Sequence, residues 1–387
     1  MDAIDPTRVG LSEAEAALRD VVRTFAAREV APLAREYEQR GEDPGPVYDR
    51  LAELGLTGIP FGAEHGGGGQ PYRTYLLVVE ELARAWLAPA IGLSVHTLVC
   101  DAVGRFATPE TRRRVLPGLL AGERFGAYAL TEPAAGSDAG ALRMRARRDG
   151  DRYLLSGQKQ FCTRGAEADV ILTMARTADG GPVSAFLVEK PVPGLQAVRA
   201  ENKMGWRSSP TWQLSFDDCP VPAANRLGEE GDGMRIALSA LDAGRLGVSA
   251  CSVGLAQAAL DAALVFAADR SQFGRPIGEH QGVRFMLADM ATQLEAGRAL
   301  LRRATELKDA GAAYGPQAAM AKLFCSDTAM RVATDAVQVH GGYGYVEEFP
   351  VERYMREAKA LQIVEGTNQI QRLVIGRALF PRPPGTA

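Results

Sequence analysis

The chain has 387 residues, of which 46% are hydrophobic, so it can bury more than one core, and two or three packed units are expected rather than a disordered chain. Its 44 basic and 47 acidic residues leave a formal net charge of -3, which provides no overall field to recruit nucleic acid or an anionic membrane and favours a small molecule or another protein as partner. The five cysteines are scattered without a Cys-x-x-Cys pair, and there is neither a basic leader nor a run of eighteen uncharged apolar residues, so we expect a reduced, cytoplasmic protein with no membrane span.

The first third predicts helices. Ser12 and Glu15 have the spacing of a capping box, and apolar residues follow them at helical intervals. Further helical patterns cover residues 72–87 and 93–106, and Thr108 followed by proline indicates another helix start. We therefore expect a helical N-terminal domain over residues 1–123.

The sequence pattern changes from helical to strand-like between residues 124 and 228. Short stretches rich in strand-forming residues are separated by Gly, Pro, Asn and Asp, and they cover 125–130, 153–163, 170–175, 183–188 and 211–216. This pattern is typical of a small antiparallel barrel or sandwich, which we expect to form a middle domain over residues 124–228.

Long helical patterns rich in alanine and leucine return after residue 233. They are interrupted at residues 272–276, 311–315 and 340–342, and we expect a C-terminal helical domain over residues 229–387. The order helical, strand, helical favours an α+β multidomain architecture over alternating βαβ units with a parallel sheet.

Glycine clusters are candidate phosphate sites, because backbone N–H groups can approach a phosphate closely there. Gly66–Gly69 lacks the preceding strand and the spacing of a dinucleotide-binding fingerprint, so a loop is expected. Residues 134–138 and 340–342 combine glycine with polar side chains at junctions between elements. Taken singly, each of these two segments is also explained by a turn.

Glu365 is a candidate base. It precedes Gly366 and Thr367, and Thr367 can cap a following helix, whose dipole would favour the ionised carboxylate. An apolar ligand beside the carboxylate would raise its pKa by desolvation. From spacing alone, a solvated charge at a helix start is the simpler interpretation.

Arg245 and Arg270 lie in or at the ends of apolar helical patterns, so each needs an anion or a carboxylate, and internal ion pairing is the default explanation. The four histidines show no spacing typical of metal ligands, and no Gly-x-Ser-x-Gly motif is present. No metal is therefore expected.

Taken together, the motifs resemble the acyl-CoA dehydrogenase family. Residues 128–138 (YALTEPAAGSD) resemble its first signature, and residues 338–345 (QVHGGYGY) with 365–372 (EGTNQIQR) resemble its second. The resemblance extends over essentially the whole chain in the same order and spacing. It implies a helical N-terminal domain, an antiparallel β-barrel middle domain and a C-terminal four-helix bundle, with FAD between barrel and bundle.

The resemblance also assigns candidate cofactor residues. The flavin and its pyrophosphate would be contacted by Tyr128, Leu130, Thr131, Gly136, Ser137, Phe161, Cys162 and Thr163. A second group would hold the adenine end of a cofactor bound mainly by a neighbouring subunit, and it comprises Arg270, Phe273, Gln281, Gln338, Gly341 and Gly342. Thr367, Asn368 and Gln369 would close over the cofactor. A homotetramer is therefore expected.

The implied activity is α,β-dehydrogenation of an acyl-CoA to the trans-2-enoyl-CoA, in fatty acid or branched-chain amino acid catabolism. Glu365 would take the α-proton while the β-hydrogen passes to the flavin as hydride. The backbone N–H of Glu365 and a ribityl hydroxyl would polarise the thioester carbonyl. The substrate would be contacted by Ser137, Asp242, Arg245, Val364 and Gly366. Electron-transfer flavoprotein is the expected electron acceptor.

Three positions bear on substrate and mechanism. One subgroup of the family carries its base where this chain has Gly244, which supports Glu365 as the base here. Val364 and Phe161 replace the tyrosine and tryptophan usual in the family. The smaller Val364 predicts a branched or otherwise bulky acyl group over a plain short linear one, and short or branched acyl chains are favoured overall. Two alternatives stay open: a flavin oxidase or monooxygenase on the same fold, and a non-catalytic acyl-CoA-binding scaffold.

Overall fold

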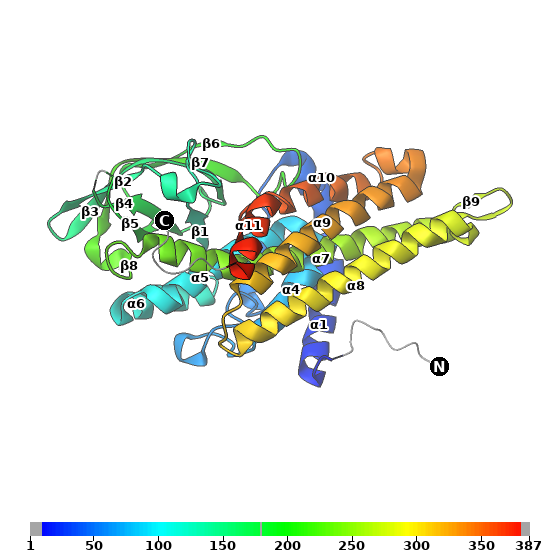
Figure 1. Cartoon of the computed structure of the whole chain (residues 1–387), viewed down its shortest axis with the longest axis horizontal. Helices are drawn as coiled ribbons and strands as arrows, with labels where there is room; N and C mark the ends of the chain where they lie inside the picture. Colours follow the sequence, from blue (N-terminus) through cyan, green and yellow to red (C-terminus); the bar gives the residue numbers. More distant parts are fainter. Residues whose placement is uncertain (1–9, 179, 381–387) are drawn as a thin grey trace.

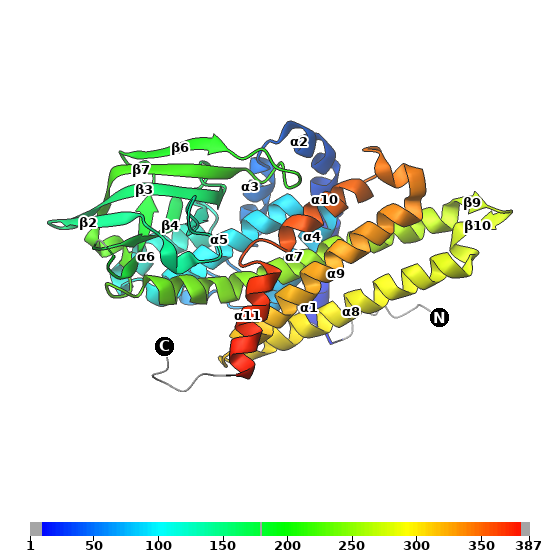
Figure 2. The same cartoon turned by 45° about the horizontal axis from the view of Figure 1, so that its top comes forward.

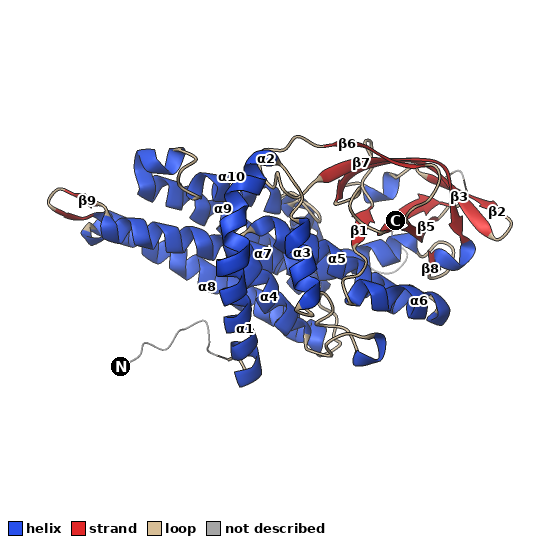
Figure 3. Ribbon diagram, turned by 180° about the vertical axis from the view of Figure 1, so that it is seen from behind, coloured by secondary structure: helices blue, strands red, loops and turns tan. Residues whose placement is uncertain are grey.

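The computed structural model describes residues 10–178 and 180–380. A β-sheet lies at one end of an elongated helical body, and a small hairpin projects from the opposite end (Figure 1). The N-terminal helices α1 to α3 cross the face of the body seen in Figure 3, whereas α9 to α11 cover the face seen in Figure 1.

The helices that precede the sheet are α1 (Glu13–Phe25), α2 (Ala34–Arg40), α3 (Gly45–Glu53), α4 (Tyr72–Ala85), α5 (Leu87–Phe106) and α6 (Pro109–Leu120). The predicted capping box of α1 is confirmed: Ser12 Oγ accepts from the Glu15 N–H at 3.2 Å, and the Ser12 N–H donates to Glu15 Oε2 at 2.8 Å. Thr108 caps α6, as predicted. Helix α5 begins at Leu87 rather than at residue 93. Its first turn contains Pro89, which a helix tolerates there because the N–H groups of the first turn have no acceptor within the helix.

The middle of the chain forms one sheet of β1 (Gly126–Ala129), β2 (Arg145–Asp149), β3 (Arg152–Thr163), β4 (Val170–Arg176), β5 (Val183–Glu189), β6 (Leu195–Ala200), β7 (Thr211–Pro222) and β8 (Arg226–Leu227). The strand order is β6-β7-β3-β2-β4-β5-β8, with β1 also paired to β4. Figure 2 shows β6, β7 and β3 side by side in this order. All pairs are antiparallel except β1–β4 and β2–β4, which are parallel and were not anticipated. Both faces of β4 and β5 are buried, consistent with their continuous apolar runs.

The C-terminal part consists of α7 (Gly233–Asp269), α8 (Gln281–Asp309), α9 (Gly315–His340), α10 (Val351–Leu361) and α11 (Asn368–Leu379). The three predicted interruptions are confirmed. They correspond to the hairpin of β9 (Ser271–Gln272) and β10 (Arg275–Pro276), the turn between α8 and α9, and the short 3₁₀ segment Gly341–Tyr345.

Helix α7 connects the two ends of the molecule. It packs on β4 and β5 near its start and on α4, α8 and α9 farther along (Figure 1). Small residues allow this close packing: a Cβ at Gly254 would lie only 2.2 Å from the carbonyl oxygen of Glu80 in α4. The domain limits expected after residues 123 and 228 lie in the α6–β1 and β8–α7 connections.

Helices α5 and α7 are long and apolar enough to cross a membrane by length and composition alone. Most of the apolar stretch of each is buried against other elements of the protein, as in the core helices of a globular fold.

Candidate active site

Glu365 lies in the loop between α10 and α11. The predicted cap of α11 is confirmed, because Thr367 Oγ1 accepts from the Ile370 N–H at 3.3 Å. Glu365 itself has φ 52°, a conformation that costs free energy for a residue with a Cβ and persists only where the surroundings hold it. The loop is held by the Asn368 N–H, which donates to Gln362 O at 3.0 Å, and by Gln371 Nε2, which donates to Gly366 O at 2.7 Å.

The Glu365 side chain points at α7. A Cβ at Gly244 would lie 2.0 Å from Glu365 Oε2, so only glycine at position 244 leaves room for the carboxylate. The residue as a whole is half-buried, but Oε2 is enclosed and accepts no hydrogen bond from any residue that the structure describes. The solvated charge that spacing alone favoured is therefore not what the fold produces.

Burial raises the pKa of Glu365 to about 7, while the positive charges of Arg245 and Lys322 act in the opposite direction. A carboxylate with a pKa near the working pH is well matched to abstract a weakly acidic proton, since both its ionised fraction and its basicity are then substantial. An enclosed acceptor without a donor also marks a position that a ligand can complete.

Arg245 lies in the next position of α7. Its Nη1 donates to Asp242 Oδ1 at 2.6 Å, which confirms the expected internal ion pair. Its Nε is buried and has no partner among residues 10–178 and 180–380, so part of the guanidinium is left for another acceptor. Burial raises the pKa of Asp242, and Arg245 opposes that shift.

The first signature begins in β1 and continues into a segment that lies against β3. Leu130 O accepts from Lys159 Nζ at 3.0 Å, and Thr131 O accepts from the Gln160 N–H at 2.8 Å. The hydroxyl of Tyr128 donates to the carbonyl of Ala237 in α7 at 3.4 Å. The predicted residues Gly136 and Ser137 are exposed. The structure thus brings Leu130 and Thr131 next to Lys159 and Gln160 of β3, which directly precede residues 161–163.

Phe161 is 61% exposed and has φ 58°, at an irregularity in the pairing of β3 with β7. Cys162 beside it is buried, and Thr163 is half-buried. An open aromatic side chain held in a strained conformation, with the threonines of both segments nearby, suits a flat heteroaromatic ring with polar edges. These residues fit the isoalloxazine of FAD.

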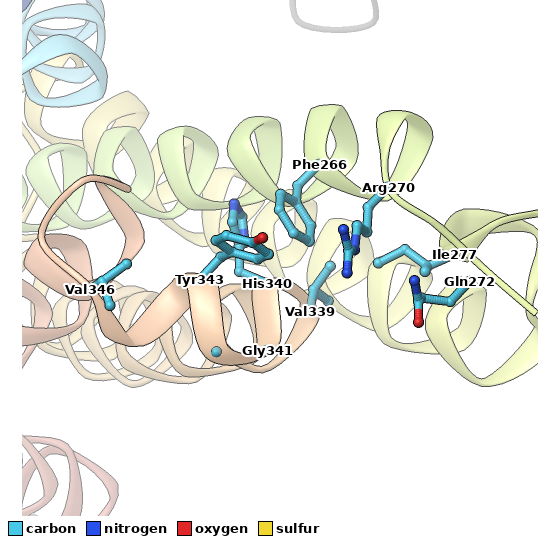
Figure 4. Close-up of a pocket in the computed structure, with 10 residues that line it drawn as sticks. Phe266, Arg270, Gln272, Ile277, Val339, His340, Gly341, Tyr343 and Val346 are labelled. Carbon is cyan, nitrogen blue, oxygen red and sulfur yellow. The ribbon is translucent and has the colours of Figure 1, made fainter.

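The second predicted cofactor group lies near the other end of the molecule (Figure 1). Arg270, Gly341 and Gly342 line a cavity of about 520 Å³ between the end of α7 and the 3₁₀ segment after α9 (Figure 4). The Arg270 guanidinium lies 5.5 Å from the ring centroid of Tyr343. Among the other predicted residues, Phe273 is 95% exposed on the hairpin, and Gln281 and Gln338 are exposed outside the cavity lining.

The remaining predicted residues lie around the Glu365 loop. Asn368 is buried, and its Nδ2 donates to Ser326 Oγ at 3.0 Å and to Asp327 Oδ1 at 2.7 Å. Gln369 is exposed, and Val364 packs against the buried helical core. Asn368 therefore secures the loop to α9.

Sequence reasoning missed two kinds of residue near Glu365. Lys322 is fully buried and donates to Gly366 O at 3.0 Å. Tyr72 and Tyr75 are buried in α4, where burial raises their pKa values with a smaller contribution from the charge of Glu365. A lone lysine within an alanine-rich helical pattern was the available signal for Lys322.

Family models for the acyl-CoA dehydrogenase N-terminal, middle and C-terminal domains match residues 12–123, 127–219 and 231–380. An acyl-CoA dehydrogenase of Bacillus subtilis is 45% identical, with 96% of this chain and 99% of the relative covered. A short-chain-specific acyl-CoA dehydrogenase of Clostridium acetobutylicum is 40% identical with the same coverage. The mitochondrial isobutyryl-CoA dehydrogenase of Bos taurus is 39% identical, with 98% of this chain and 92% of the relative covered.

Solved structures agree over nearly the whole chain. Butyryl-CoA dehydrogenase of Megasphaera elsdenii matches with a TM-score of 0.94 at 41% identity, covering 95% of this chain and 98% of that one. A chain in a structure of the electron-transferring flavoprotein of Acidaminococcus fermentans matches with a TM-score of 0.94 at 43% identity, covering 97% and 100%. A Mycobacterium smegmatis glutaryl-CoA dehydrogenase in complex with FADH2 matches with a TM-score of 0.92 at 28% identity, covering 99% and 98%. The chain therefore belongs to the acyl-CoA dehydrogenase family, as an oxidoreductase that uses FAD to act on acyl-CoA thioesters.

Proposed function

We propose that this enzyme converts a short or branched acyl-CoA to the trans-2-enoyl-CoA with Glu365 as the base. The observation that carries the proposal is the enclosed Glu365 Oε2, which has no protein donor among the described residues and faces the space kept open by Gly244. The raised pKa of Glu365, about 7, matches proton abstraction near neutral pH.

The same loop supplies a second requirement, because the α-hydrogen becomes acidic only if the thioester carbonyl is polarised. The Glu365 N–H donates to no protein acceptor within the described part of the chain, so it is available to the carbonyl oxygen of a bound thioester. Bound FAD supplies the redox chemistry by accepting the β-hydrogen with its electron pair. The protein's own tasks are to align the thioester, keep Glu365 ionised and exclude water.

The surroundings of α7 favour a short acyl group. A Cβ at Gly247, one turn beyond Gly244, would lie 2.1 Å from Ser94 Oγ and 3.6 Å from the Tyr75 hydroxyl. The hydroxyls of Tyr75, Ser94 and Thr97 are buried near one another without a well-aligned hydrogen bond. Because these side chains already fill the space beside Gly247, little room is left there for a long alkyl chain running along α7.

Branching is supported by Val364, because valine in place of a larger side chain leaves lateral room next to the base. The test compares kcat/KM for butyryl-, isobutyryl-, 2-methylbutyryl- and octanoyl-CoA. Val364→Tyr should lower the isobutyryl-to-butyryl ratio by about tenfold, the usual order for one methyl group in an apolar pocket. Ile363→Tyr, at an exposed neighbouring position, should leave the ratio unchanged. A wild-type preference for octanoyl-CoA would reject the short-chain proposal.

The base is tested by Glu365→Gln, which keeps the size of the side chain and removes its charge. Anaerobic bleaching of the flavin by the thioester should be abolished, while FAD content and thioester binding remain. Undiminished bleaching would place the base elsewhere. In the same preparation, peroxide release on admitting air would favour an oxidase, and a wild-type protein that cannot be loaded with FAD would favour a scaffold.

The comparisons, the cavity beside Arg270 and the cysteines support proposals for the electron acceptor, the oligomeric state and the location of the enzyme. The similarity to a chain in the Acidaminococcus fermentans structure supports electron-transfer flavoprotein as acceptor. The cavity beside Arg270 lies far from the flavin-facing residues of the same chain, which supports a homotetramer in which subunits complete each other's cofactor sites. All five cysteines are free and buried, which supports a reducing, cytoplasmic location.

A further inference from the structure

Lys322 is a buried cation behind the Glu365 loop. It projects from α9 with no exposed surface, and its Nζ donates to Gly366 O at 3.0 Å and to Asn368 Oδ1 at 2.9 Å. Both acceptors are neutral oxygens. Burying an ammonium group that has only neutral partners costs free energy of folding, so a nearby negative charge is needed to account for it.

Glu365 provides that charge. Burial lowers the pKa of Lys322 to about 7, and the charge of Glu365 is the main influence that opposes this shift, with a smaller one from Asp327. Conversely, among the described residues Arg245 and, after it, Lys322 are the cations that hold down the pKa of Glu365. Arg245 already donates to Asp242, whereas Lys322 has no such carboxylate partner among its hydrogen bonds.

The hydrogen bonds of Lys322 also shape the loop. Gly366 O accepts from Lys322 of α9 and from Gln371 of α11, so the peptide that follows Gly366 is held from two helices. The Asn368 side chain is fixed by Lys322 together with Ser326, one turn farther along α9. This clamp accounts for the positive φ of both Glu365 and Gly366.

From this geometry we propose that Lys322 is a positioning residue for the dehydrogenation: its ammonium clamps the Gly366 carbonyl and adds a second buried positive charge to that of Arg245, so that Glu365 stays ionised before substrate binds. The proposal rests on Glu365 being the base.

Several other titratable and charged side chains lie around Glu365 and influence the pH dependence of the reaction. The charged and titratable side chains that face it come from α4, β1, α7 and α9, and they are Tyr72, Tyr75, Tyr128, Arg245, Cys251 and Lys322. Burial raises the pKa values of the three tyrosines and of Cys251, so these groups stay neutral near pH 7. Within the described part of the chain, Arg245 and Lys322 are the cations whose charge stabilises the carboxylate.

The test uses Lys322→Met in the FAD-loaded enzyme, with Ser326→Ala as the matched control that loosens the same network without removing charge. The rate of anaerobic flavin bleaching by subsaturating butyryl-CoA is followed against pH. Because the base must be ionised and loss of a nearby cation raises its pKa, the midpoint for Lys322→Met should move up by about one unit. Bleaching should then be about tenfold slower near pH 6 and approach the wild-type rate near pH 9.

Ser326→Ala should keep the wild-type midpoint. A uniform loss at every pH in Lys322→Met, or an unchanged profile, would overturn the charge role. If Lys322→Met does not retain FAD, Lys322→Gln, which keeps a donor for Gly366 O and removes the charge, gives the same readout. Glu365→Gln separates the two proposals: continued bleaching in that variant rejects the base, whereas lost bleaching with no pH shift in the Lys322 variants rejects only Lys322.

Discussion

Two buried lysines show how differently this protein treats interior charge. Lys159, in β3, has no exposed surface and donates to Glu132 Oε1 at 2.8 Å and to Leu130 O at 3.0 Å. Glu132 also accepts the N–H groups of Arg143 at 2.6 Å and Met144 at 3.0 Å, so both partners of the ion pair are satisfied. Lys322, in α9, has two neutral acceptors, and the carboxylate it acts on, Glu365, keeps an oxygen without a donor.

This difference distinguishes an ion pair that stabilises the fold from a site that takes part in the reaction. A buried polar atom without a partner costs about 1–3 kcal/mol, and a ligand that supplies the missing partner removes that cost. The Lys159 pair ties the segment after β1 to β3 and leaves nothing for a ligand to complete. The site around Glu365 is incomplete in the protein alone and is therefore the part that substrate can finish.

Removing Lys159 should have the largest effect on stability. Lys159→Met leaves the Glu132 carboxylate buried without its cation, and we expect a loss of about 3–5 kcal/mol in the free energy of unfolding. The control is Arg152→Met, which breaks an exposed pair with Asp149 and should cost less than about 1 kcal/mol. Urea unfolding of both variants measures the contrast. Equal losses would mean that burial does not distinguish the two pairs.

Gly244→Ala should lower the rate of flavin bleaching rather than the stability of the fold. The new Cβ would meet the end of the Glu365 side chain, so the carboxylate moves while the fold tolerates alanine within a helix. A displacement of about 1 Å at a reacting group can cost about a hundredfold in rate, and flavin bleaching by butyryl-CoA should slow by that order with FAD content unchanged. Gly104→Ala, whose Cβ would meet only Leu116 Cδ2 at 3.8 Å, is the matched control.

If Gly104→Ala and Gly244→Ala bleach at the same rate, the orientation of Glu365 toward α7 is not the one used in the reaction. If both variants lose FAD, the effect belongs to packing of the helices rather than to the position of the carboxylate.

The sequence predicted local structure where the pattern was strong. The capping box before α1, the cap before α6 and the interruptions of the C-terminal helices follow from short-range chemistry, so they could be located without a structure. Strand β2 was missed because its outward positions are arginines, and only Ala146 between them points into the core. Strand β6 was missed because it is largely exposed and carries no buried stripe.

The candidate site also has parts that could be predicted from the sequence and parts that could not. Glu365 and the cap at Thr367 can be recognised from a few consecutive residues, and the resemblance added the segments that we predict to face the flavin. The contact of Glu365 with Gly244 joins positions that are distant in sequence, so spacing could not show that the carboxylate is enclosed. Lys322 has no motif around it, and its role depends on α9 passing behind the α10–α11 loop.

The smallest predicted effect compares the two caps at opposite ends of the chain. Thr367→Ala and Ser12→Ala each remove an acceptor from the first turn of a helix, and each should cost about 1 kcal/mol in the free energy of unfolding. Only Thr367→Ala also frees the loop that carries Glu365, so flavin bleaching should slow by about fivefold in that variant, the rate equivalent of about 1 kcal/mol. Thr367→Ser keeps the hydroxyl and should restore both properties. If Thr367→Ala bleaches at the wild-type rate while losing the same stability as Ser12→Ala, the hydrogen bonds of Lys322 and Gln371 to Gly366 O are sufficient to hold the base in place.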